Sequence, residues 1–413
     1  MSVVSLRRAD REDKRELILE EASAQFNERG FSDVRLEDIG DALGATKASI
    51  SYHFQSKAAL LEAAYMRSCE VLGDLLEEAE HAGGGITGLA TWVESVAQLH
   101  SAALANNRPQ LAYLNDLNAL ESVSRGRIGT RIADQISVIE GFLRDGGAAN
   151  SSRATAVLFW SMPGWIGPWL SAIPARRHAR QIERLVDFFV QGIRANAAWP
   201  GSGSLAIADR GADLLFNREE RARLKRDAFE RAGIRCFNER GYAGLSLNAM
   251  ADELGASRST FYYTFADKDA LLEACARRSQ NRILAILDAI DEAPGPILPN
   301  IAAGFARLYS EHVSNLEPIL RGCIYSSLPR SKNAIAEAEW QGIVARLARL
   351  LAQCLSEGSC KDSGLEKFEL VMLSVLQNIA MGPGFAELPG GNPYANASAE
   401  DYFAPLFMGF AGD

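Results

Sequence analysis

The sequence predicts an all-α protein made of two copies of one helical unit. First, residues 15–63 align without a gap on residues 226–274, with 19 identities in 49 positions. Second, apolar residues recur at helical spacing in both copies, and neither half shows a sustained strand alternation. Third, segment 196–213 contains the Pro, Gly and Ser residues typical of a linker. The length of 413 residues agrees with two or more domains.

The predicted helices follow the same order in both copies. Apolar residues at helical spacing precede Gly30, which stands where a glycine commonly ends a helix. Gly44 stops the next, short helix in the same way. The further helices are predicted at about 36–43, 47–53 and 57–81 in the first copy, and the second copy has its helices at about 218–240, 247–254, 258–264 and 268–291.

Composition and motifs exclude several classes of protein. Hydrophobic residues make up 47% of the chain and charged residues 23%, which is typical of a globular protein. The formal charge of −9 argues against indiscriminate binding to polyanions but is compatible with a local basic patch. The sequence contains no nucleotide-binding, hydrolase or metalloprotease motif, so we expect no enzyme activity.

Cysteine spacing and apolar runs bear on metal sites and location. The six cysteines form no C-x-x-C pair and have no histidine spacing that completes a zinc site, so the sequence predicts reduced thiols and no metal. Segment 154–175 holds 22 residues without a charge, but its prolines and glycines would break a membrane span, and a buried helix explains it better. No signal peptide is visible. We therefore expect a cytoplasmic protein without a membrane partner and without a cofactor.

Two short helices around a tight turn at Gly44 or Gly255 predict a helix-turn-helix. The motifs around each turn are FNERG (26–30 and 237–241), D-x-L-G-A (41–45 and 252–256), Y-x-F-x-x-K (52–57 and 263–268) and ALLEA (59–63 and 270–274). This pattern resembles the TetR (tetracycline-repressor-like) family. The resemblance implies that each half has an N-terminal three-helix DNA-binding domain and a helical ligand-binding and dimerisation domain. It further implies that the two halves dock as an intramolecular pseudo-dimer.

The expected domain organisation has five parts. They are a first helix-turn-helix domain at 10–56, a first regulatory domain at 57–199, a linker at 200–216, a second helix-turn-helix domain at 217–267 and a second regulatory domain at 268–413. In the family the last two helices of each subunit pair with those of the partner. The matching segments are 151–172 with 176–196, and 363–381 with 398–411. A further dimer of whole chains stays open.

Each helix-turn-helix is expected to have a small apolar core and an outward face for DNA. The expected core residues are Phe26, Leu36, Ile39, Leu43, Ile50, Phe54 and Leu60, with Phe237, Leu247, Met250, Leu254, Phe261, Phe265 and Leu271 in the second copy. The candidate DNA-binding residues, small or hydrogen-bonding as groove entry requires, are Arg35, Thr46, Lys47, Ala48, Ser49, Ser51, Tyr52, His53 and Lys57, with Ser246, Ser257, Arg258, Ser259, Thr260, Tyr262, Tyr263, Thr264 and Lys268. The alternative for each is a solvated side chain on a helix face.

The resemblance assigns roles to some of these side chains. Tyr52 and its counterpart Tyr263 are expected to contact phosphates or the sugar edge. Lys57, which opens the fourth helix, is expected to meet a phosphate, as is Lys268 in the second copy. Lys47 and Arg258 are the candidates for guanine. His53 has no partner at ligand spacing, so we expect it at DNA or on the helix surface rather than in catalysis.

The reading positions differ between the copies. Ser51 stands where the family has the first of two tyrosines, which Tyr262 retains, and Arg35 replaces a helix cap that Ser246 retains. Residues 5–67 carry 10 basic and 12 acidic side chains, whereas residues 217–283 carry 13 and 10, so the second copy is expected to bind DNA more strongly. Two different reading helices in one chain predict a non-palindromic operator bound by a single chain.

The family usually binds a small molecule inside the helical domain, and aromatic residues mark where a pocket could lie. They are Trp92, His100, Tyr113, Phe142, Trp160, Trp165, Trp169 and Trp199 in the first half, and Phe305, Tyr309, His312, Tyr325 and Trp340 in the second. Core packing is the alternative for each. The expected effector is hydrophobic, such as a steroid, an aromatic or an acyl compound.

Together these features predict a sequence-specific, DNA-binding transcriptional regulator, namely a repressor released by a small hydrophobic effector. The alternative is a DNA-binding regulator that a protein partner controls. An apolar cavity would favour the effector, and filled cores would favour the protein partner.

Overall fold

The computed structural model describes residues 11–105, 111–147, 152–193, 218–322, 324, 330–381, 389, 391–394 and 396–409, and this part of the chain contains helices and no β-strand. The first half contains α1 (Arg11–Asp33), α2 (Leu36–Ala42), α3 (Lys47–His53), α4 (Lys57–His81), α5 (Gly85–Leu104), η1 (Leu117–Ala119), α6 (Ser122–Asp145), α7 (Arg153–Trp160), α8 (Pro163–Ser171), η2 (Ala175–Arg177) and α9 (His178–Gln191). The second half contains α10 (Arg218–Gly244), α11 (Leu247–Glu253), α12 (Arg258–Thr264), α13 (Lys268–Glu292), α14 (Ile297–Val313), α15 (Arg330–Ser356), α16 (Phe368–Asn378) and α17 (Ala399–Phe407).

Glycines and capping side chains set the ends of the short helices. Gly44 and Gly255 have φ angles of 65° and 61°, a left-handed conformation that glycine adopts without steric cost. They turn the chain from α2 into α3 and from α11 into α12. The hydroxyl of Thr46 then accepts a hydrogen bond from the Ser49 N–H group, and Ser257 caps α12 in the same way. The turn into the third helix is therefore built by the same local interactions in both units.

The helices predicted for the two copies are confirmed to within a few residues. Although α1 and α10 extend past Gly30 and Gly241, these glycines have φ angles of 73° and 68°, so the chain changes direction there. The expectation of a single buried helix over 154–175 is wrong. The chain forms α7 and α8 instead, because Pro163 lacks an N–H group and is placed in the first turn of α8.

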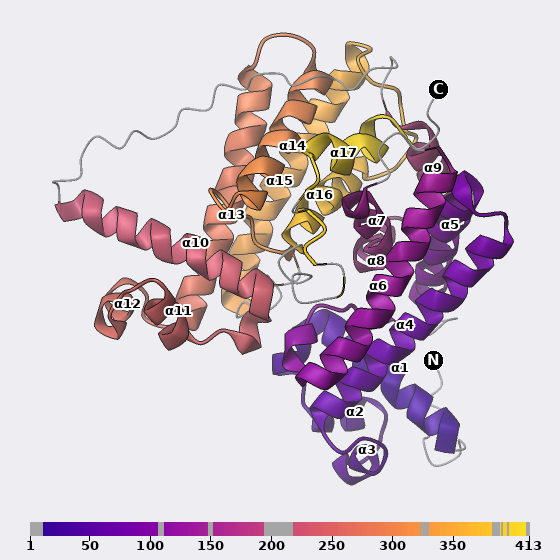
Figure 1. Ribbon diagram of the computed structural model, residues 1–413, viewed down its shortest axis with the longest axis vertical. Coiled ribbons are helices and arrows are strands. Elements are labelled where there is room, and N and C mark those ends of the chain that lie inside the picture. The colour runs from indigo at the N-terminus through magenta and orange to yellow at the C-terminus, as the bar shows by residue number, and fades with distance from the viewer. Residues whose placement is uncertain are drawn as a thin grey trace.

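The two halves meet along their last helices (Figure 1). α7 contacts α17, α8 contacts α16, and α9 contacts α17. Across this contact the rings of Phe188 and Phe368 lie 5.1 Å apart between centroids, and the hydroxyl of Thr155 donates to the carbonyl oxygen of Asp401 at 2.7 Å. The contacting helices fall within the segments expected to pair. One apolar core runs through both halves here.

The two helix-turn-helix units differ in how they join that core. Ile39 and Ile50 of the first unit belong to the apolar core that continues into α4–α9. The second unit instead has a separate apolar cluster, which includes Phe237 and Phe261. The expectation that Leu254 lies in this core is wrong, since it is 36% exposed at the end of α11.

Some expectations fall on residues outside the described part of the chain. These are the linker at 200–216, Trp199 and Tyr325. Among the residues that are described, no helix is long and apolar enough to cross a membrane, and no cluster of His, Cys, Asp or Glu side chains could hold a metal ion. The five described cysteines are free thiols.

Candidate DNA interface and cavity

The third helix of each unit presents its predicted reading side chains to solvent. On α3, Lys47 and Ser51 are exposed and Tyr52 is 69% exposed. On α12, Arg258 is exposed and Tyr263 is 90% exposed. The remaining predicted residues of these helices are exposed or half-buried, namely Thr46, Ala48, Ser49 and His53 on or beside α3 and Ser257, Ser259, Thr260, Tyr262 and Thr264 on or beside α12. Each helix is anchored by a buried apolar residue on its opposite face.

The two reading helices differ in the charge that accompanies their basic residue. Lys47 forms an ion pair with Glu37 of α2, with 2.7 Å between Nζ and Oε1, and this hydrogen bond lowers the pKa of the Glu37 carboxyl. The position that corresponds to Glu37 in the second copy is Asn248. Arg258 forms no ion pair with the described residues. We call each helix-turn-helix unit, with its first helix, a head. The reading lysine of the first head is paired with a carboxylate, whereas the reading arginine of the second has no ion-pair partner among the described residues.

Lys57 and Lys268 lie against their own domains. The Lys57 ammonium donates to the carbonyl oxygens of Phe31 (2.6 Å), Ser32 (3.2 Å) and Val34 (2.9 Å), and it lies 4.3 Å from the centroid of the Phe31 ring. Lys268 lies 4.4 Å from the centroid of the corresponding Tyr242 ring. Burial lowers the pKa of both lysines. Their ammonium groups thus tie the fourth helix to the turn that follows the first.

The caps of the second helices differ as the sequence indicates. The Ser246 hydroxyl accepts from the Ala249 N–H group at 3.4 Å. At Arg35, the carboxylate of Asp38 accepts from the Arg35 N–H group at 3.1 Å and also pairs with Arg29 at 2.9 Å. Asp38 thus satisfies the N–H group of the cap residue in the first copy, whereas the Ser246 hydroxyl satisfies an N–H group of the first turn in the second. The Arg35 hydrogen bond lowers the pKa of Asp38.

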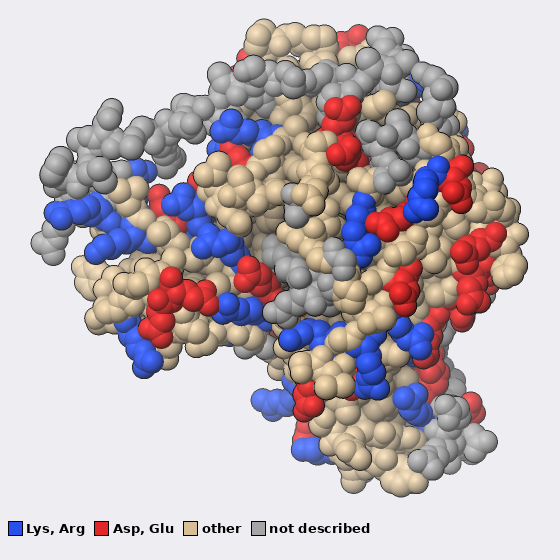
Figure 2. All heavy atoms as spheres, in the orientation of Figure 1, with Lys and Arg blue, Asp and Glu red and all other residues tan. Residues whose placement is uncertain are grey.

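Basic side chains gather along α10 of the second head (Figure 2). Arg221, Lys225 and Arg226 are exposed on this helix. Arg226 lies 4.6 Å from the centroid of the Phe265 ring and pairs with Glu230 at 2.9 Å. The positive surface of this head therefore extends well beyond its reading helix.

Each FNERG motif contains an asparagine that attaches its head to the regulatory domain of the same half. Asn27 of α1 donates to the carbonyl oxygen of Leu111 at 2.6 Å and accepts from the N–H group of Tyr113 at 2.7 Å. We call this pair of hydrogen bonds the asparagine clamp. A serine of α4 adds a third bond, because the Ser68 hydroxyl accepts from the N–H group of Ala112 at 2.9 Å.

The same clamp recurs in the second half. Asn238 of α10 donates to the carbonyl oxygen of Ile319 at 2.8 Å and accepts from the N–H group of Arg321 at 2.9 Å, while Ser279 accepts from the N–H group of Leu320. Sequence reasoning missed these asparagines. Their signal was the identity of a polar residue in both copies of the motif.

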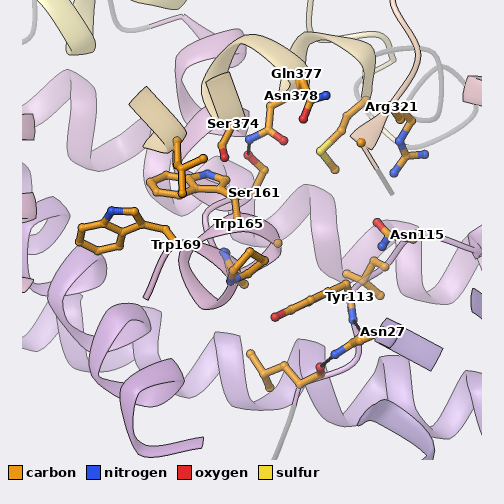
Figure 3. Close-up of a pocket in the computed structure, with 18 of the residues that line it drawn as sticks. Asn27, Tyr113, Asn115, Ser161, Trp165, Trp169, Arg321, Ser374, Gln377 and Asn378 are labelled. Atoms are coloured by element: carbon orange, nitrogen blue, oxygen red, sulfur yellow. Dashed lines mark hydrogen bonds between the residues drawn. The ribbon is translucent and has the colours of Figure 1, made fainter. Parts of the chain in front are cut away.

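The clamped segments 111–113 and 319–321 lead into a cavity of about 430 Å³ that lies between the two halves (Figure 3). Its first-half walls are residues 111–115 and the α7–α8 region. Its second-half walls come from α13, α15, α16 and the residues Arg321 and Gly322. Tryptophan rings and leucines supply most of the apolar lining, and Ser161, Ser374, Gln377 and Asn378 supply polar atoms. A cavity of this size can hold a small organic molecule.

Five of the predicted ligand residues line this cavity, namely Tyr113, Trp160, Trp165, Trp169 and Trp340. The other described candidates lie outside it, in packed regions: Trp92, His100, Phe142, Phe305, Tyr309 and His312 are buried core residues. For example, the Trp92 indole donates to the carbonyl oxygen of Phe159 at 3.0 Å, and the Phe305 ring packs on Phe403 at 5.4 Å. The sequence indicates the aromatic residues of each half, but it does not indicate that some of them line a cavity between the halves.

Each of the two helix-turn-helix units matches one known protein family. Residues 18–64 and 231–275 each match the family described as bacterial regulatory proteins, tetR family. A TetR-family transcriptional regulator from Bordetella parapertussis 12822 is 22% identical, covers 43% of this chain and 94% of its own, and has a TM-score of 0.37. A protein from Pseudomonas aeruginosa PAO1 described as a transcriptional regulator is 23% identical, covers 45% of this chain and 93% of its own, and has a TM-score of 0.31. No curated protein matches the chain.

The two family matches coincide with the two helix-turn-helix units, from α1 to the start of α4 and from α10 to the start of α13. The family is one of non-enzymatic regulators. The chain therefore carries two DNA-binding domains of the TetR family of bacterial regulatory proteins and is a DNA-binding transcriptional regulator.

Proposed function

We propose that this protein is a repressor that binds one non-palindromic operator with its two heads and releases it when a small hydrophobic molecule enters the cavity between the halves. The observation that carries the proposal is the asparagine clamp. Segment 111–113, which holds α1 through Asn27, lines the cavity, and so does Arg321, whose N–H group is bonded to Asn238 of α10. A molecule in the cavity therefore touches the attachments of both heads at once.

The difference between the reading helices supports recognition of two unlike half-sites. A homodimer presents two identical helices and reads a palindrome. Here α3 offers Lys47 paired with Glu37, whereas α12 offers Arg258 without an acidic partner among the described residues. Arg reads guanine through two parallel hydrogen bonds, so the half-site under α12 is expected to contain a guanine contact.

We assign different roles to the exposed tyrosines and the half-buried lysines. Tyr52 and Tyr263 present their rings to solvent on the reading helices, and we assign them to the DNA backbone. Lys57 has its ammonium on three carbonyl groups of its own domain. We therefore assign Lys57 and, by position, Lys268 to the orientation of the reading head, with phosphate contact as a secondary role.

Release of DNA follows from the position of the cavity. A ligand that displaces segment 111–115 or 319–322 moves the clamped end of α1 or α10, and with it the attached reading helix. Such coupling requires only that the ligand favours one of two arrangements of these segments. Control by a protein partner is the second candidate, but a cavity of about 430 Å³ with an aromatic lining favours a small molecule.

Binding-site selection from random duplexes, followed by a mobility shift, tests the two-head proposal. The expected consensus has two unlike half-sites, and the shifted complex contains one chain. Inverting one half-site while its sequence is kept should weaken binding by at least about tenfold, because the corresponding reading helix then meets the wrong bases. A palindromic consensus, or two chains per site, would contradict the proposal.

A further inference from the structure

The repeat brings two equivalent positions to face the same cavity with different chemistry. Tyr113 and Arg321 each donate a backbone N–H group to the clamp asparagine of their half, and each lines the cavity. In the first half the side chain at this position is a phenol, and in the second it is a guanidinium. The cavity is therefore asymmetric, with its buried cation supplied by the second half (Figure 3).

Arg321 is buried, with 8% of its surface exposed, but it lacks an anion within ion-pair distance among the described residues. Its guanidinium makes one long hydrogen bond, from Nη1 to the carbonyl oxygen of Asn238 at 3.5 Å, and its Nε has no partner there. A buried guanidinium normally has a carboxylate or several acceptors around it, because removing the charge from water is costly. Arg321 thus lines the cavity and has one buried donor, Nε, without a partner among the described residues.

Two carboxyl groups, one that interacts electrostatically with Arg321 and one that lines the cavity, are not bonded to it. Asp116 accepts the N–H group of Phe31 at 3.1 Å, and its pKa is raised by burial against the opposing effects of that bond, Arg321 and Lys57. Glu337 also lines the cavity, is exposed, and accepts from the Gln341 amide at 2.8 Å. The Arg321 guanidinium therefore has no carboxylate in direct contact among the described residues.

A second unused donor lines the same cavity. The Trp165 indole Nε1 is buried and has no hydrogen-bond partner among the described residues. Around it the rings of Trp160, Trp169 and Trp340 and the side chain of Leu370 supply apolar surface. The lining thus combines apolar surface with two buried donors that have no partner among the described residues, one of them on a positively charged group.

We propose that the cavity binds a hydrophobic carboxylic acid, with its carboxylate on Arg321 and its apolar body between the tryptophan rings. This assignment rests on the proposed function and narrows its effector to an amphipathic anion. It also gives the ligand a direct route to the second head. The carboxylate competes with the carbonyl oxygen of Asn238 for the Arg321 guanidinium, and Asn238 belongs to α10.

Calorimetric titration of the full chain with matched acids and amides tests the assignment. The probes are 1-naphthaleneacetate with 1-naphthaleneacetamide, and octanoate with octanamide. Each pair differs in charge but little in shape. We expect at least one acid to bind at least about tenfold more tightly than its amide. Equal affinities of acid and amide, or no binding of either acid, would overturn the assignment.

Variants at two positions locate the effect. Arg321→Met is expected to remove the preference for the acid, whereas Arg321→Lys retains part of it because the charge remains. Ser374 provides an independent pair of variants that leaves the clamp untouched: Ser374→Glu should abolish acid binding by repulsion, and the equally large Ser374→Gln should not. An acid preference that survives Arg321→Met, or that Ser374→Glu leaves intact, would overturn the assignment.

Operator release measured in the same samples separates this inference from the proposed function. Release of DNA by acid and amide alike means that the cavity controls DNA binding but that Arg321 does not select the ligand, which overturns the inference alone. Acid binding that depends on Arg321 but leaves the DNA complex intact supports the ligand class and contradicts the proposed control.

Discussion

Replacing Asn238 by alanine should loosen the second DNA-binding head. Asn238 is 1% exposed, and its side chain satisfies the carbonyl group of Ile319 and the N–H group of Arg321. Alanine leaves both buried backbone groups unpaired, and each such group costs about 1–3 kcal/mol, so the expected loss is about 2–6 kcal/mol. The loss should appear as easier local opening of α10–α12, because this head has its own apolar cluster.

Native-state hydrogen exchange measures that opening residue by residue. A loss of about 2 kcal/mol corresponds to about 30-fold faster exchange in α10–α12. Asn27→Ala is the matched control in the first half: Asn27 is only half-buried, so water can replace part of its bonding and the expected loss is about 1 kcal/mol. Exchange in α10–α12 that changes less than about threefold with Asn238→Ala would refute the argument.

Three further predictions concern the reading helices and the buried His312. Glu37→Asn removes the ion-pair partner of Lys47, which can then contact a phosphate or a base. Operator affinity should rise about threefold to tenfold, and its salt dependence should steepen by about one counterion. A mobility shift titrated with salt measures both, and an unchanged affinity would contradict the prediction. Tyr52→Phe and Tyr263→Phe should each weaken operator binding about fivefold by removing one hydrogen bond, and an effect of Tyr263→Phe alone would mean that the first head does not engage DNA. Burial lowers the pKa of His312 to about 4, below the value of about 6.5 in the unfolded chain. The unfolded chain therefore binds a proton at His312 at a higher pH than the folded chain does. This difference contributes up to about 3 kcal/mol to the free energy of unfolding above pH 6.5, and the contribution is lost as the pH falls towards 4. Urea unfolding between pH 7 and pH 4.5 should show this decline, and His312→Gln should reduce its slope.

The sequence predicts the helix-turn-helix units well because their determinants are local. Glycine at Gly44 and Gly255, hydroxyl caps at Thr46 and Ser257, and apolar anchors at helical spacing specify each unit within about 50 residues. Exposure of the reading side chains follows directly from that spacing. Leu254 is the exception: it keeps the predicted spacing, but it stands just past the last residue of α11 and is 36% exposed.

The cavity and the pairing of the two basic residues depend on contacts that the sequence does not display. Trp165 of α8 and Trp340 of α15 are 175 positions apart, and they line one cavity because α16 packs against both of these helices. Neutralisation of Lys47 by Glu37 similarly depends on how α2 crosses α3. The aromatic composition of each half therefore indicates that a pocket could exist without indicating that the two halves share it.

The separate apolar cluster of the second head has an evolutionary consequence. A substitution among Phe237, Met250 and their neighbours alters packing inside that cluster, whereas one among Ile39 and Ile50 is transmitted into the core shared by both halves. The second head can therefore accumulate changes at lower risk to the rest of the fold. In a duplicated and fused gene this allows one DNA preference to diverge while the other is held constant.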